Sequence, residues 1–147
     1  MRRASPSAFK MFRYIFAPTD IPVSIPTELT KFKCLILIER EVSEEHQWEV
    51  SKALIKAGCL YSLAWGIDCY SWDESVDYAC MEHYDYGDIP DEEYVMTTWH
   101  ETDTLEETIE FAKNCTQNSD VKLEDILVLD FVKKERETLI EGIYLKA

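Results

Sequence analysis

The chain of 147 residues is long enough for one domain with a proper core and too short for two ordinary domains. Its 29 acidic and 15 basic residues give a formal net charge of -14, which argues against nucleic acid or an anionic membrane as a partner. No stretch approaches the roughly 18 apolar residues of a membrane span. We expect one cytoplasmic domain over residues 11–147, with residues 1–10 a disordered or added extension.

The five cysteines are odd in number and include no close CxxC pair, which argues against a disulfide framework or a thiolate zinc site. Four of them lie in apolar stretches, where a free thiol acts as a small hydrophobic side chain in a reducing compartment. Only Cys69 lies in a polar loop. The full set is Cys34, Cys59, Cys69, Cys80 and Cys115.

The first predicted elements are a strand at residues 11–16 and a longer strand at residues 34–38. Three prolines between them, Pro18, Pro22 and Pro26, exclude a helix and favour an extended edge strand or strap. The run at 34–38 is apolar throughout, as in a strand buried on both faces of a parallel sheet. Ser43 then predicts a helix N-cap, and Gly58 predicts the end of that helix.

Three further strand-and-helix pairs follow. Two of the helices begin with a capping-box pattern, in which Ser or Thr at the cap is followed three residues later by Glu. These pairs are Ser71 with Glu74, and Thr104 with Glu107. The predicted strands cover residues 59–65, 94–99 and 126–132, and the predicted helices cover about 71–84, 104–115 and 135–145. A polar loop at 116–125 contains no hairpin signal.

This alternation of strand and helix predicts an α/β fold. The connections are long enough for right-handed crossovers between parallel strands. We therefore expect a three-layer α/β/α sandwich with a mainly parallel four-stranded sheet, and a possible extra N-terminal edge strand. The strand order does not follow from the pattern.

Two polar segments follow strands and would meet at the carboxyl edge of such a sheet, the usual ligand crevice of open α/β sheets. Asp68 and Cys69 follow one strand, and His100 and Glu101 follow the next. A Cys/His pair there is a legitimate nucleophile and base, with Asp68 or Glu101 as orienting or acidic group. Against this reading, the surrounding carboxylates would raise the thiol pKa.

The same residues with His83 could supply mixed nitrogen and oxygen ligands to a metal, but their spacing matches no known metal motif. The chain has four glycines and contains neither GxGxxG nor a P-loop pattern. We therefore predict no metal and no cofactor.

A second candidate surface combines aromatic and acidic side chains, which make good anchors for a protein partner. It is the loop between the helix predicted at about 71–84 and the strand predicted at 94–99. Its candidate partner-binding residues are Tyr84, Asp85, Tyr86, Asp88, Asp91, Glu92 and Glu93. Trp65 and Trp99, at predicted strand ends, are expected in the core instead.

Several segments together resemble a small family of uncharacterised bacterial proteins, a domain of unknown function. The segments are Gly58-Cys59-Leu60-Tyr61, Ala64-Trp65-Gly66-Ile67-Asp68-Cys69, Ser71-Trp72-Asp73-Glu74-Ser75-Val76-Asp77, Tyr86-Gly87-Asp88-Ile89-Pro90-Asp91 and Val95-Met96-Thr97-Thr98-Trp99-His100-Glu101. The resemblance spans roughly residues 31–131. It implies a bacterial source and brings no activity, cofactor or catalytic residue.

Our leading hypothesis is a non-enzymatic, acidic binding protein of the bacterial cytoplasm, of the immunity or inhibitor type, that acts on a basic protein partner. The motivation is the charge, the acidic aromatic loop and the lack of a recognisable catalytic motif. The alternative is a small hydrolase-like enzyme that uses Cys69 and His100. The sequence does not indicate the oligomeric state.

Overall fold

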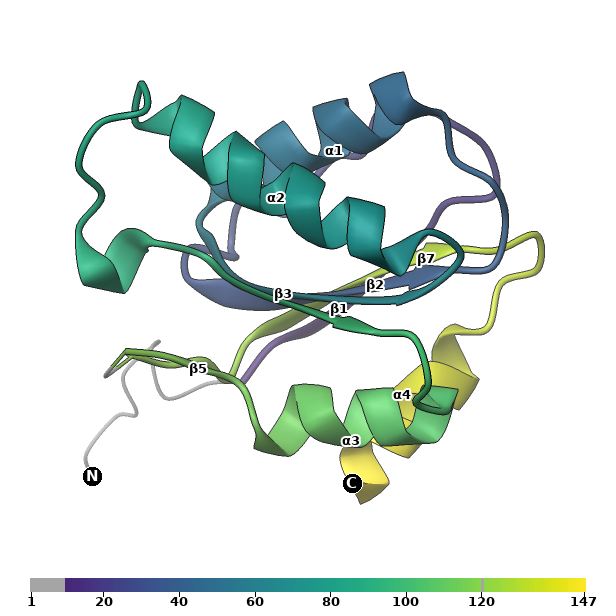
Figure 1. Ribbon diagram of the computed structural model, residues 1–147. Helices are drawn as coiled ribbons and strands as arrows, with labels where there is room; N and C mark the ends of the chain where they lie inside the picture. The colour runs from purple at the N-terminus through teal and green to yellow at the C-terminus, as the bar shows by residue number, and fades with distance from the viewer. Residues whose placement is uncertain (1–9, 120) are drawn as a thin grey trace, which may run out of the picture.

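A five-stranded parallel sheet forms the middle layer of the computed structural model, which describes residues 10–119 and 121–147 (Figure 1). The strand order is β1-β7-β2-β3-β4. The strands are β1 (Phe12–Phe16), β2 (Phe32–Ile38), β3 (Cys59–Gly66), β4 (Met96–His100) and β7 (Ile126–Phe131). Apart from Lys10, the predicted extension at residues 1–10 lies outside the described residues.

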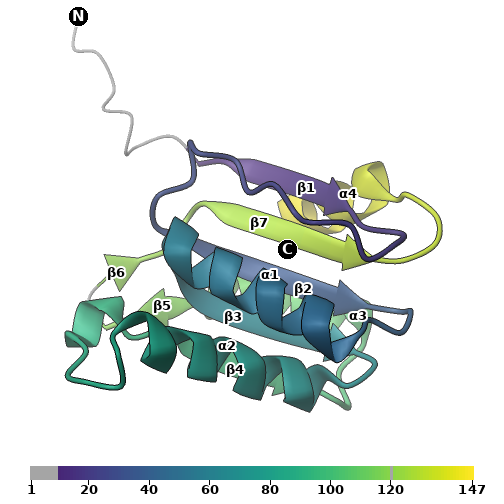
Figure 2. The ribbon, with the colours of Figure 1, turned by 90° about the horizontal axis from the view of Figure 1, so that it is seen from above.

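Two helices cover each face of the sheet (Figures 1 and 2). One face carries α1 (Glu44–Ala57) and α2 (Cys69–His83), and the other carries α3 (Leu105–Asn114) and α4 (Glu137–Lys146). The predicted α/β/α sandwich is therefore confirmed, and β1 is the extra N-terminal edge strand. No helix in the described ranges has the length and apolar character needed to cross a bilayer.

The centre of the sheet is β2, which pairs in parallel with β7 on one side and β3 on the other. All seven of its residues are buried, which explains its unbroken apolar run. Alternate side chains enter two separate cores. Ile36 packs with Trp72 of α2 and Phe131 of β7 on one face, while Leu35 packs with Ile109 of α3 and Ile140 of α4 on the other.

Glycine is required at the ends of α1 and β3. Gly58 and Gly66 both have φ of 106°, a left-handed conformation that favours glycine. A Cβ on Gly66 would lie 2.0 Å from the carbonyl oxygen of Ile38, so β2 and β3 approach each other there at backbone distance. Gly58 is the predicted helix end, and the predicted caps Ser43 and Thr104 are also present.

The predicted capping box at Ser71 and Glu74 is wrong. Helix α2 begins at Cys69, and its N-cap is Asp68, which has a left-handed backbone and no side-chain cap bond. Ser71 lies in the first turn and hydrogen-bonds Gln47 of α1 instead. The early start places both Cys69 and Trp72 in the core, so packing outweighs the local capping preference.

The loop predicted at residues 116–125 contains a short antiparallel pair, β5 (Gln117–Asn118) and β6 (Val121–Lys122). Asn118 anchors this pair because its buried amide donates to the carbonyls of Leu60 (2.7 Å) and Tyr94 (2.6 Å). Nothing like Asn-Gly marks the turn. The pair depends on this tertiary contact, which the local sequence does not reveal.

Candidate functional site

The predicted catalytic residues do lie at the carboxyl edge of the sheet, where β3 and β4 end. Cys69 is 2% exposed and belongs to the core beneath α1 and α2. His100, the last residue of β4, turns to the opposite face and packs its ring against Phe111 of α3, with centroids 4.9 Å apart. The backbones of these two residues therefore lie near each other at the sheet edge, while their side chains point to opposite faces of the sheet.

Both ring nitrogens of His100 already have partners. Nδ1 lies 2.8 Å from a carboxylate oxygen of Asp103, and Nε2 lies 3.0 Å from the hydroxyl of Thr98. The ring is buried, so these bonds hold it between β4 and α3. This geometry gives His100 a structural role in anchoring the loop after β4.

The thiol of Cys69 lacks the environment of a nucleophile. Burial, together with the nearby Glu101 carboxylate, raises its pKa, so the thiol form dominates at neutral pH. Asp68 and Glu101 are themselves exposed. Within the described residues, no three His, Cys, Asp or Glu side chains are grouped as metal ligands would be.

Thiol labelling tests this assignment directly. Cys115 is exposed and the other four cysteines are buried. We expect a maleimide to modify Cys115 first in the native protein and to modify Cys69 at least about tenfold more slowly, because the buried thiol is neither accessible nor ionised. Peptide mass spectrometry against time measures both rates, with the urea-unfolded chain as the control. Preferential labelling of Cys69 would restore the nucleophile hypothesis.

A buried charged network occupies the same sheet edge on the α4 side. Asp130 at the end of β7 is 0% exposed and accepts two hydrogen bonds from the Arg136 guanidinium, both of 2.9 Å. The phenol of Tyr14 donates to the same carboxylate at 2.5 Å, and Glu39 pairs with Arg136. Burial and the Asp130 carboxylate raise the pKa of Tyr14. This network ties the chain entering α4 to β1, β7 and β2.

The acidic aromatic loop lies at the other end of α2, before β4. It includes one turn of 3-10 helix, Asp91–Glu93, and its backbone is held by local hydrogen bonds such as Tyr86 N to Met81 O (2.9 Å). Tyr86 is 70% exposed. Of the predicted partner-binding residues, Tyr84 is half-buried, while Asp85, Tyr86, Asp88, Asp91, Glu92 and Glu93 are exposed.

Trp99 is exposed rather than buried in the core, so that expectation is wrong. It lies on β4, the edge strand, where the sheet covers only one side of it, and 44% of it is accessible. Its ring packs edge-to-face against exposed Tyr70 of α2, with centroids 5.0 Å apart. Trp65 is half-buried, and its indole donates to the Asp103 carbonyl (2.9 Å).

Two carboxylates of α2 lie against β4 and the residues just before it; Asp73 is buried and Asp77 is half-buried. Asp73 is near Thr97, and Asp77 is near Tyr94, just before β4. Burial raises the pKa of both carboxyl groups, and the charge of Asp77 raises that of Asp73 further. We call the exposed residues Tyr70, Met96 and Trp99 the β4 surface. The sequence named the neighbouring loop but missed this surface, because exposure of a strand-end tryptophan depends on strand order.

The fold is a parallel α/β sandwich whose edge strand β4 exposes Met96 and Trp99, and whose carboxyl edge directs the side chains of Cys69 and His100 to opposite faces of the sheet. The chain belongs to the DUF7684 family, a domain of unknown function, whose model matches residues 12–147. This match confirms the expected resemblance to a domain of unknown function. No curated protein and no solved structure matches the chain.

Proposed function

We propose that the chain is a non-enzymatic binding protein that holds a basic segment of a partner protein along β4. The observation that carries this proposal is the Tyr70–Trp99 pair, an exposed aromatic anchor at an edge strand that follows the exposed acidic loop and precedes exposed Glu101 in the chain. Buried aromatic anchors dominate the energy of protein interfaces, and surrounding charge steers and selects the partner.

The position of β4 supports strand addition as the mode of binding. In the described part of the chain, β4 pairs only with β3, so its outer backbone groups are free of a sheet partner. An extended peptide can pair with such an edge and place alternate side chains on either side of it. Trp99 would contact the peptide on the α2 face, and exposed Met96 would contact it on the other.

Charge complementarity indicates a basic partner. The chain has a formal net charge of -14, and β4 lies in the chain between the exposed acids of the loop Tyr84–Glu93 and exposed Glu101. Covering a basic surface in this way fits an immunity or inhibitor-type protein. We place this function in the bacterial cytoplasm, because four buried free cysteines fit a reducing compartment.

Titration with a model peptide tests this proposal. We expect an octapeptide of alternating Lys and Val to shift the backbone amide NMR signals of β4, α2 and the loop, and a Glu-Val peptide to shift none. Trp99→Ala should weaken binding at least about tenfold, because it removes the anchor. Leu139→Ala is the matched control, since Leu139 is an exposed apolar residue on α4.

Two results would contradict the proposal. One is a set of shifts spread evenly over all acidic residues, which would reduce the interaction to long-range attraction. The other is an unchanged affinity of Trp99→Ala. High salt should slow association while leaving the site of the shifts unchanged, because screening acts on the acids rather than on the aromatic anchor.

A further inference from the structure

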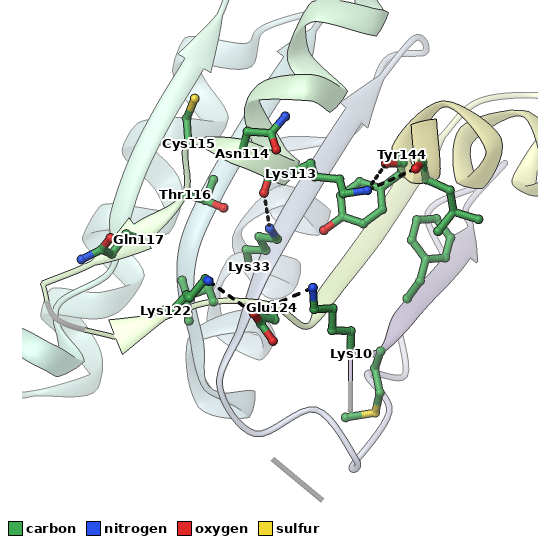
Figure 3. Close-up of a pocket in the computed structure, with 14 residues that line it drawn as sticks. Lys10, Lys33, Lys113, Asn114, Cys115, Thr116, Gln117, Lys122, Glu124 and Tyr144 are labelled. Carbon is green, nitrogen blue, oxygen red and sulfur yellow. Dashed lines mark hydrogen bonds and ion pairs between the residues drawn. The ribbon is translucent and has the colours of Figure 1, made fainter. Parts of the chain in front are cut away.

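A cavity of about 740 Å³ opens at the amino end of the sheet, on the side of α3 and α4 (Figure 3). The starts of β1 and β2, the ends of α3 and α4, and the segment after β6 line it. Its volume lies within the usual range of small-molecule sites. It is distant in the fold from the carboxyl edge discussed above.

The charge of this cavity is opposite to that of the protein. Lys10, Lys33, Lys113 and Lys122 line it, and Glu124 is the single acid among its described lining residues. Lys10 and Lys122 both approach this carboxylate, at 3.9 and 3.7 Å. The described lining therefore carries four ammonium groups and one carboxylate, in a chain where acids outnumber bases by almost two to one.

Lys33 and Lys113 form the inner part of the cavity (Figure 3). Lys33 is 2% exposed, and among the residues that the structure describes its ammonium donates one long hydrogen bond, 3.4 Å, to the Lys113 carbonyl. The Lys113 ammonium donates to the carbonyls of Tyr144 (3.0 Å) and Leu145 (3.3 Å). Neither lysine has a carboxylate within 4.0 Å in the described residues.

Both ammonium groups also lie against one aromatic ring. The Tyr144 centroid is 5.6 Å from the Lys33 nitrogen and 5.3 Å from the Lys113 nitrogen. Burial raises the pKa of Tyr144 to about 12, so the ring is neutral and offers its face rather than a counter-charge. Such contacts relieve only part of the cost of burying a cation without an anion.

Burial also lowers the pKa of Lys33 to about 8, an effect that Glu124 opposes and the charges of Lys113 and Lys10 reinforce. Lys33 is still mostly protonated at pH 7. The cavity therefore holds a charged, buried donor with unused hydrogen-bonding capacity under ordinary conditions.

We propose that this cavity binds a small phosphate-bearing anion, with its phosphate between Lys33 and Lys113 and its rim closed by Lys10 and Lys122. Lysine acts as a point charge and suits the tetrahedral oxygens of phosphate, whereas planar carboxylates are best matched by arginine, which is missing from the described lining. The volume leaves room for an organic group beyond the phosphate.

Calorimetric titration of the full chain with pyrophosphate, in a chloride buffer of low ionic strength at pH 7.5, tests this proposal. We expect a dissociation constant below about 1 mM, and weaker binding of citrate, whose charge is similar but whose groups are carboxylates. Lys33→Met and Lys113→Met should each weaken pyrophosphate binding at least about tenfold. Lys56→Met, which removes an exposed lysine of α1, should change it less than twofold.

Backbone amide NMR locates the bound ion in the same samples. Support requires shifts concentrated at Lys33, Lys113 and Tyr144. The proposal is overturned if pyrophosphate does not bind up to about 10 mM, if the two lysine variants bind as the parent chain does, or if citrate binds equally well. Because both variants remove one positive charge, as Lys56→Met does, general attraction cannot produce the expected difference.

Discussion

Replacing Arg136 with Met is expected to lower the free energy of unfolding by about 3–5 kcal/mol. The substitution removes the counter-charge of Asp130, which is 0% exposed and would then be buried with only the Tyr14 phenol as a side-chain partner. A buried carboxylate left without its counter-charge destabilises the folded state by more than the ion pair itself contributed to stability. Urea denaturation, followed by tryptophan fluorescence, measures the change.

Two further variants separate this network from a general effect of the substitution. Asp130→Asn in the Arg136→Met background should recover most of the loss, because a neutral amide needs no counter-charge. Glu39→Gln should cost less than about 1 kcal/mol, since Glu39 is 42% exposed at its side chain and its pair with Arg136 faces solvent. A loss below about 1 kcal/mol for Arg136→Met would show that the network contributes little.

The layers of this fold could be predicted because periodicity and caps are local signals. The unbroken apolar run of β2 indicates burial on both faces, and Ser43, Gly58 and Thr104 mark helix ends through their own backbone bonds. Ser71 shows the limit of that approach. Its capping-box pattern with Glu74 does not mark the start of α2, because an earlier helix start buries Trp72.

The candidate sites depend on information that is not local. Parallel strands explain why Cys69 and His100 share one sheet edge, but the face that each side chain takes depends on strand parity and on where α2 begins. Trp99 is exposed because β4 is an edge strand, and one chain's pattern does not reveal strand order. Lys33 and Lys113 are 80 positions apart and share no motif.

Lys33 should make the protein less stable below pH 8 than it would be without this lysine. The pKa of Lys33 is 10.5 when the side chain is in water, as in the unfolded chain, and about 8 in the folded chain. The charged form therefore lowers the free energy of unfolding. At 1.36 kcal/mol per pKa unit, the cost is about 3 kcal/mol. Between about pH 8 and 10.5 the unfolded chain binds the extra proton, so this contribution makes stability rise with pH and the cost disappears.

We therefore expect Lys33→Met to raise the free energy of unfolding by about 3 kcal/mol at pH 7, and by little at pH 10.5. Urea titrations of both chains across this range measure the difference, and subtraction cancels the tyrosines that titrate at high pH. Lys56→Met should show no such pH-dependent gain. A constant difference at all pH values would mean that packing, rather than charge, is responsible.

This gain in stability has a functional meaning if the cavity holds an anion. Pyrophosphate should stabilise the parent chain more than it stabilises Lys33→Met, which binds it more weakly, so the difference in stability between them narrows as the ligand concentration rises. A buried lysine lowers the free energy of unfolding of the unliganded protein, and a bound anion offsets this loss. Such a loss of stability is expected at a binding site. If pyrophosphate leaves the difference at pH 7 unchanged, Lys33 is a buried charge without a ligand.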